Sequence, residues 1–143
     1  IEFDHIEAWE PSTSKANFNE SVPDEFRERV TFHREFIAGR PHQRETFVPH
    51  LIRNNTQPGD FVMFKLDIDN ELVEVGVVEY LLSDEGKVDA KLITEFYWEH
   101  HAKGNYFMAP GLEPGDSPSQ SLNASYHLFL QLRQAGIRAH AYV

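Results

Sequence analysis

The spacing of apolar and polar residues changes repeatedly along this chain, and the changes predict strands separated by helices. Short runs rich in Val, Ile and aromatic residues predict strands over residues 3–8, 30–37, 61–66, 92–99 and 137–143. Helical spacing, caps and flanking Pro or Gly predict helices over residues 23–29, 43–54, 71–83 and 125–135. Because strands that alternate with helices favour a parallel sheet with right-handed crossovers, the predicted fold class is α/β, with a mostly parallel sheet and flanking helices.

Each of the two best-defined helical patterns predicts a buried face. In the helix at 71–83 the inward side chains are predicted to be Leu72, Val75, Val78 and Leu82. In the helix at 125–135 they are predicted to be Tyr126, Phe129, Leu130 and Leu132. Gly136 stands where a helix C-terminus favours glycine. Residues 11–22 and 104–121, rich in Ser, Asn, Pro or Gly, are predicted to be irregular.

Length and charge narrow the classes of protein to which this chain can belong. Its 143 residues suffice for a single α/β domain over residues 1–143, and it contains no cysteine for disulfides or thiolate metal sites. The net charge of −10 opposes binding to nucleic-acid phosphates and to anionic membranes. Its apolar runs are too short to insert directly into a bilayer. We therefore expect a soluble domain.

The run at residues 61–66 is typical of a strand buried on both faces, and it ends in a pair of carboxylates. In parallel α/β sheets, ligands bind at the carboxyl ends of strands, where Asp67 and Asp69 follow. Residues two apart in an extended chain face the same way, so both side chains are expected to converge on a polar ligand or a cation. The alternative is that Asp69 or Asn70 caps the following helix.

Acidic residues follow two other predicted strands. Glu99 would lie beside Asp67 if their strands are neighbours, and the histidines at 100 and 101 follow it. Their spacing is not diagnostic of a metal site, and we predict no metal. Glu10 follows the first strand, where a carboxylate can accept hydrogen bonds from ribose hydroxyls in nucleotide-binding α/β folds. The alternative is that Glu10 is simply exposed.

Taken in order, these segments resemble an FkbM-like methyltransferase that depends on S-adenosylmethionine. The resemblance rests on Ile-Glu-Ala-Trp-Glu-Pro at 6–11, the strands at 30–37 and 92–99, and Phe-Leu-Gln-Leu-Arg-Gln-Ala-Gly-Ile at 129–137. It also rests on Lys-Leu-Asp-Ile-Asp-Asn at 65–70, which is similar to the family's Lys-x-Asp-x-Glu-Gly. This motif departs from the family's form where Asp69 and Asn70 replace Glu-Gly.

The resemblance implies a Rossmann-like fold, S-adenosylmethionine as cofactor and a role for each acidic residue. It implies that Glu10 binds the cofactor ribose and that Asp67 lies near the methyl acceptor; we add Asp69 and Glu99 as candidate catalytic residues. It also implies a central strand and a Gly-rich cofactor loop upstream of residue 1, so we expect the domain to be incomplete at this end. The chain alone is then expected to bind the cofactor poorly.

Three functions follow from these expectations. The first is methyl transfer by a domain that an upstream segment completes. The second is a non-catalytic structural or interaction subunit, with a protein partner covering the open sheet edge. The third is a metal-dependent glycosyltransferase-like enzyme in which Asp67 and Asp69 bind a cation.

Overall fold

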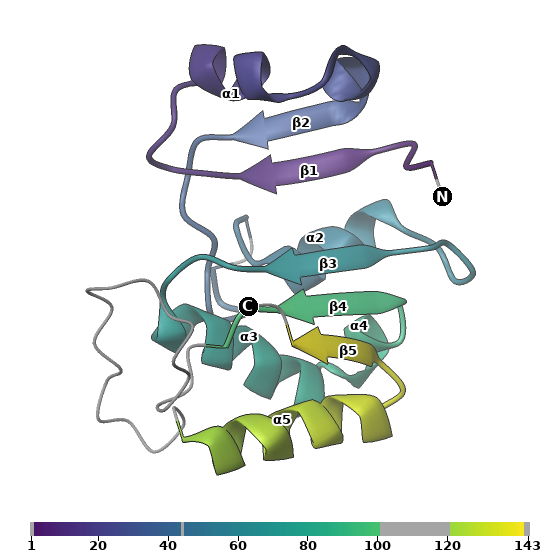
Figure 1. Cartoon of the computed structure of the whole chain (residues 1–143). Coiled ribbons are helices and arrows are strands. Elements are labelled where there is room, and N and C mark those ends of the chain that lie inside the picture. Colours follow the sequence, from purple (N-terminus) through teal and green to yellow (C-terminus); the bar gives the residue numbers. More distant parts are fainter. Residues whose placement is uncertain (1, 44, 101–120, 142–143) are drawn as a thin grey trace. The chain divides into compact units, whose positions relative to one another are not determined.

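The computed structural model describes residues 2–43, 45–100 and 121–141, which form two compact units (Figure 1). The first unit spans Ile1–Ile37 and the second spans Ala38–Val143. The chain is α/β, with parallel strands in two small sheets flanked by helices, which confirms the predicted fold class. That residues 1–143 form a single domain stays a prediction.

The first unit consists of two strands joined by a helical crossover. Strand β1 (Ile6–Trp9) pairs in parallel with β2 (Val30–His33), from Ile6 opposite Val30 to Trp9 opposite His33. Helix α1 (Lys15–Ser21) and the 3₁₀ helix η1 (Asp24–Arg29) form the crossover between the strands. A parallel pair needs such a crossover, because a tight turn can join only antiparallel strands.

Helix α1 lies inside a segment that the sequence predicted to be irregular, and that prediction is wrong. The side chain of Ser14 caps the helix by accepting a hydrogen bond from the backbone N–H of Asn17 at 3.2 Å. The ring of Phe18 stacks on Phe32 of β2, with ring centroids 4.2 Å apart. Packing on a distant strand, rather than an apolar period, therefore stabilises this short helix.

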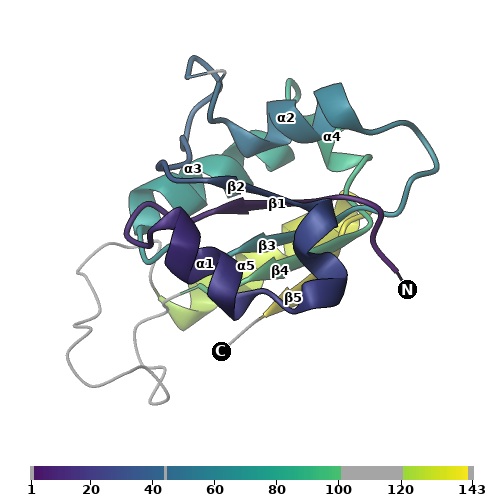
Figure 2. The same cartoon turned by 90° about the horizontal axis from the view of Figure 1, so that it is seen from above.

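The second unit contains a three-stranded sheet of parallel strands in the order β3-β4-β5 (Figure 1). These are β3 (Met63–Leu66), β4 (Glu95–Trp98) and β5 (Arg138–Ala141). The helices are α2 (Val48–Asn55), α3 (Glu71–Leu82), α4 (Lys87–Ala90) and α5 (Leu122–Gln134). Helix α2 lies beside α4 (Figure 2). Gly136 follows α5 with a positive φ of 95°, as the predicted glycine at the helix C-terminus requires.

Helix α2 begins at Val48, later than the start predicted at residue 43. Pro49 lies in the first turn, where its missing N–H would have no partner inside the helix.

Residues 104–120 of the second predicted irregular segment lie outside the described part of the chain.

Strand β3 is buried on one face, so the prediction of burial on both faces is wrong. Phe64 and Leu66 are buried, whereas Met63 is 47% exposed and Lys65 is exposed. Buried and exposed side chains therefore alternate along β3, as in a strand that is covered on one face. On β4, the buried Trp98 packs against Phe129 of α5, which places this helix over the buried face.

The predicted inward faces of two helices are also partly wrong. On α3, Val78 is buried as predicted, but Leu72 is 84% exposed and the buried positions include Glu74. On α5, Phe129 and Leu132 are buried, whereas the predicted inward residues Tyr126 and Leu130 are exposed. Apolar residues lie on more than one side of each helix, so their spacing alone did not determine the inward side.

Gly76, in the middle of α3, allows another segment to pass directly against the helix. A Cβ atom at Gly76 would lie 2.5 Å from the carbonyl oxygen of Gly39, and one at Gly39 would lie 2.8 Å from the Cα of Val73. Two glycines thus allow the backbone around Gly39 to touch α3, at the cost of helix propensity.

Candidate functional site

The carboxyl ends of β3 and β4 bring two of the predicted acidic residues to adjacent positions. The strands pair up to Leu66 opposite Trp98, and the N–H of Glu99 donates to the carbonyl of Leu66 at 3.1 Å. Asp67 and Glu99 are the residues that follow the two strands, so the condition under which the sequence places Glu99 beside Asp67 is met. The ammonium of Lys65 lies 2.6 Å from a carboxylate oxygen of Asp67, so these two side chains form an ion pair at the carboxyl end of β3.

Asp69 lies in the turn between β3 and α3. Its φ is 53°, in the left-handed region, where Asp is tolerated better than most residues. Asn70, not Asp69, caps α3: its side-chain oxygen accepts a hydrogen bond from the N–H of Val73 at 3.3 Å. The extended backbone ends before Asp69, so the two-residue period that predicted convergence with Asp67 does not extend to it.

A fourth carboxylate, Glu74 of α3, lies buried beneath this turn and was missed by the sequence analysis. It is 1% exposed, and it accepts hydrogen bonds from the N–H of Ile68 at 3.1 Å and from the indole N–H of Trp98 at 3.0 Å. Glu74 thereby ties the residue between Asp67 and Asp69 to strand β4. No signal in the sequence singled out Glu74, because α3 also carries Glu71 and Glu79, and Glu79 is 55% exposed.

The histidine that follows Glu99 lies away from it. His100 is buried and stacks on Trp98, with ring centroids 4.3 Å apart. Alternation along the strand places Glu99 on the other face, so these two side chains do not converge. Residue 101 lies outside the described part of the chain. In that described part, no three His, Asp or Glu side chains cluster as a metal ion would require.

Glu10 of the first unit is held by its own loop. Its carboxylate accepts hydrogen bonds from the backbone N–H of Ser12 at 2.7 Å and from the Ser12 hydroxyl. These bonds lower the pKa of Glu10, so the group is ionised at neutral pH. The residue follows β1, as predicted, and its backbone N–H donates to the carbonyl of His33 at 3.1 Å. A ribose hydroxyl would share this carboxylate with Ser12.

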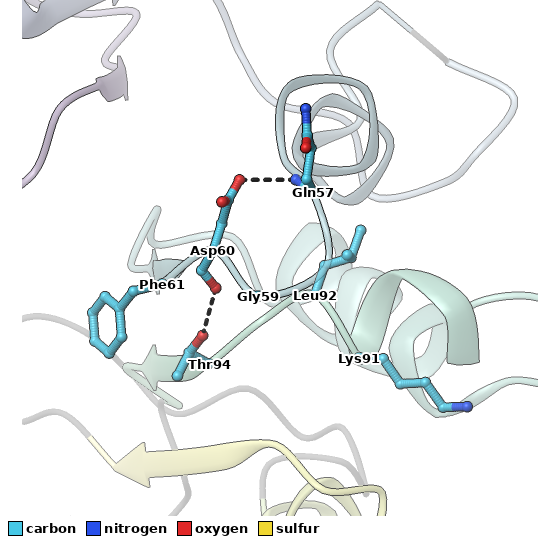
Figure 3. A pocket seen from close by; sticks show the side chains of 7 residues that line it. All are labelled: Gln57, Gly59, Asp60, Phe61, Lys91, Leu92 and Thr94. Atoms are coloured by element: carbon cyan, nitrogen blue, oxygen red, sulfur yellow. Dashed lines mark hydrogen bonds between the residues drawn. The ribbon is translucent and has the colours of Figure 1, made fainter.

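A pocket of about 320 Å³ lies at the opposite edge of the sheet, at the amino ends of β3 and β4 (Figure 3). Its lining comprises Gln57, Gly59, Asp60, Phe61, Lys91, Leu92 and Thr94. The Asp60 side chain accepts from the N–H of Gln57 at 2.8 Å, and the Thr94 hydroxyl accepts from the N–H of Val62 at 3.1 Å. These polar groups stabilise the turn before β3, and none of the predicted site residues lines this pocket.

A second polar cluster links α2, α3 and α4. The guanidinium of Arg53 lies with Nη2 2.7 Å and Nε 2.6 Å from the fully buried carboxylate of Asp89, and the Tyr80 hydroxyl donates to Asp89 at 2.8 Å. Burial and the neighbouring Asp89 raise the pKa of Tyr80 to about 12. Each member pairs with the others, so this cluster joins the helices rather than forming a site for a ligand.

No protein-family model, curated protein or solved structure matches the chain. The resemblance to FkbM-like methyltransferases therefore stays a prediction. In the described part of the chain, no helix is both long and apolar enough to cross a bilayer.

Proposed function

We propose that this chain takes part in methyl transfer from S-adenosylmethionine, with an upstream segment completing the cofactor site. The observation that supports the proposal is the adjacency of Asp67 and Glu99 at the carboxyl ends of two neighbouring parallel strands. Ligands of parallel α/β sheets bind at that edge. The resemblance in sequence around Lys65 and Asp67 selects this cofactor among the ligands that such an edge accepts.

The carboxylates fit a cationic cofactor and a protic acceptor. S-adenosylmethionine, when bound, supplies an electrophilic methyl group on a positively charged sulfur. Acidic side chains favour that charge, and a carboxylate such as Asp67 accepts a hydrogen bond from an acceptor hydroxyl or amine. Asp67, which forms an ion pair with Lys65, would accept the proton that the acceptor loses when its atom bonds to the methyl carbon and the bond between that carbon and the cofactor sulfur breaks. Glu99 orients the acceptor from the neighbouring strand.

Calorimetry with S-adenosylmethionine tests the proposal on the chain and on a form extended upstream. We expect weak binding by the chain, tighter binding by the extended form, and loss of binding on Glu10→Gln. Asp67→Asn should leave cofactor binding in place and abolish methyl transfer. Asp84→Asn is the matched control, because Asp84 is 96% exposed and pairs only locally with Lys87. Absence of binding by both forms would overturn the proposal.

A further inference from the structure

A histidine of the last strand is held in place by an aromatic ring. Trp98 of β4 is buried against α5, and Tyr97, one residue before it, lies on the opposite face of the sheet. On that face Tyr97 lies opposite His140 of the neighbouring strand β5 (Figure 1). Their rings stack, with centroids 4.8 Å apart and an angle of 20° between the planes. The imidazole is therefore fixed in position, although the side chain of His140 is 44% exposed.

A carboxylate fixes the orientation of the same imidazole. Glu95 of β4 lies with Oε2 2.6 Å from Nε2 of His140. Its Oε1 lies 2.8 Å from Nη2 of Arg138, so the carboxylate is itself held. Because a carboxylate only accepts hydrogen bonds, Nε2 of the neutral imidazole carries the hydrogen and Nδ1 carries the lone pair. Among the described residues, none donates a hydrogen bond to Nδ1.

The first unit contains a similar histidine, but both of its nitrogens face acidic side chains. Nε2 of His33 pairs with Glu7, and the ring stacks on Trp9 with centroids 4.8 Å apart. Nδ1 of His33 lies 3.6 Å from a carboxylate oxygen of Glu35. The comparison singles out His140, whose second nitrogen is left for a ligand.

His140 shares its face of the sheet with the carboxylates of the candidate site. Asp67 lies on this face because it pairs with Lys65, whose register partner is Tyr97. Glu99 lies there because it follows Tyr97 by two residues. Asp67, Glu99 and His140 thus come from three neighbouring strands. Two strand spacings and two residues separate Asp67 from His140, so their Cα atoms are about 12 Å apart, which leaves room for a sugar ring between the side chains.

We propose that His140 binds the methyl acceptor through Nδ1 and that this acceptor is a polyol of monosaccharide size, an inference that rests on the proposed methyl transfer. The two carboxylates and Nδ1 all accept hydrogen bonds, so they suit a ligand with several O–H donors. Arg138 places a positive charge beside His140, which opposes an ammonium group there and so disfavours a polyamine. One hydroxyl of the polyol reaches Asp67 and is methylated, and a second donates to His140. Glu95 contacts only the imidazole and is a positioning residue.

Methyl transfer by the form extended upstream tests His140, with methyl glycosides of glucose, galactose and mannose as probes. His140→Phe keeps a ring beside Tyr97 but has no nitrogen. It should raise the KM of an accepted glycoside about three- to tenfold, as expected for one lost hydrogen bond, and leave kcat and the affinity for S-adenosylmethionine unchanged. His140→Asn, whose amide oxygen can replace Nδ1, should restore much of the difference. His127→Phe is the matched control, because His127 is exposed on α5. Equal KM values for the two Phe variants would overturn the proposal.

Two further comparisons separate binding by His140 from a general loss of structure. Cyclohexanol has one hydroxyl, so its KM should exceed that of an accepted glycoside and should not change in His140→Phe. Glu95→Ala should raise the KM of the glycoside in the unsubstituted protein but add nothing in His140→Phe. If S-adenosylmethionine binds and cyclohexanol serves as well as every glycoside, the polyol is wrong and methyl transfer stands.

Ligand-observed NMR with the same glycosides needs no S-adenosylmethionine, so it tests the polyol site even if methyl transfer fails. Binding that His140→Phe weakens and His127→Phe does not would support the site. Absence of glycoside binding by both the chain and its extended form would overturn it.

Discussion

Replacing Glu74 should destabilise the second unit, because this carboxylate accepts hydrogen bonds from the buried indole N–H of Trp98 and from the half-buried N–H of Ile68. Glu74→Ala removes the acceptor of the Ile68 N–H and of the Trp98 indole N–H, which lie 3.1 and 3.0 Å from its oxygens. Trp98 is fully buried and Glu74 is 1% exposed, so water does not readily replace the lost acceptor. The turn that carries Asp67 and Asp69 would lose its tie to β4.

The expected cost follows from the number of donors. A buried donor left without a partner costs about 1–3 kcal/mol and the half-buried Ile68 N–H costs less, so Glu74→Ala should lower the free energy of unfolding by about 2–4 kcal/mol. Glu74→Gln keeps one acceptor oxygen and places an amide donor near the second N–H, so it should cost about half as much. Trp98→Phe removes one of the two donors, and its effect should not add to that of Glu74→Ala.

Urea unfolding followed by circular dichroism measures these differences, since the signal does not depend on Trp98. Glu79→Ala is the control on the same helix: Glu79 is 55% exposed, its nearest cation is Arg40 at 3.6 Å, and the change should cost less than about 1 kcal/mol. The reasoning is refuted if Glu74→Ala unfolds at the same urea concentration as the Glu79 variant. It is also refuted if the effects of the Glu74 and Trp98 substitutions add fully.

Gly76→Ala should lower the free energy of unfolding by about 1–3 kcal/mol in a urea titration, because the added Cβ lies 2.5 Å from the Gly39 carbonyl; stabilisation would contradict this close contact. Asp69→Val should cost about 1–2 kcal/mol in the same assay, because its φ of 53° disfavours β-branched residues, whereas Asp69→Gly should cost less than Asp69→Val because glycine adopts this conformation without strain. The pKa of Tyr80 is raised to about 12, by burial and then by Asp89, above the value of about 10 for an unfolded chain, so its stabilisation is complete below pH 10 and is lost between pH 10 and 12. Unfolding measured from pH 9 to 12 should show less of this loss in Tyr80→Phe, and an unchanged profile would refute the assignment.

The position of the candidate site could be predicted because it depends on local order along the chain. Apolar runs followed by acidic residues placed Asp67 and Glu99 at strand ends, and strands alternating with helices indicated a parallel arrangement. The same information could not separate the alternatives at the turn. Only the structure showed that the Asn70 side chain caps α3 and that Asp69 adopts a left-handed conformation.

By itself, the sequence determined which segments form strands, where the longer helices lie and which acidic residues follow strands. Tertiary structure alone decided which sides of these elements are buried: Glu74 became the buried acceptor of α3, Gly76 a point of close contact, and Tyr126 an exposed residue. The physical reason is that periodicity arises within one segment, whereas burial depends on which distant segment packs against it. An apolar side chain is buried only where a distant segment covers it. A carboxylate is buried only where the surrounding segments also supply hydrogen-bond donors.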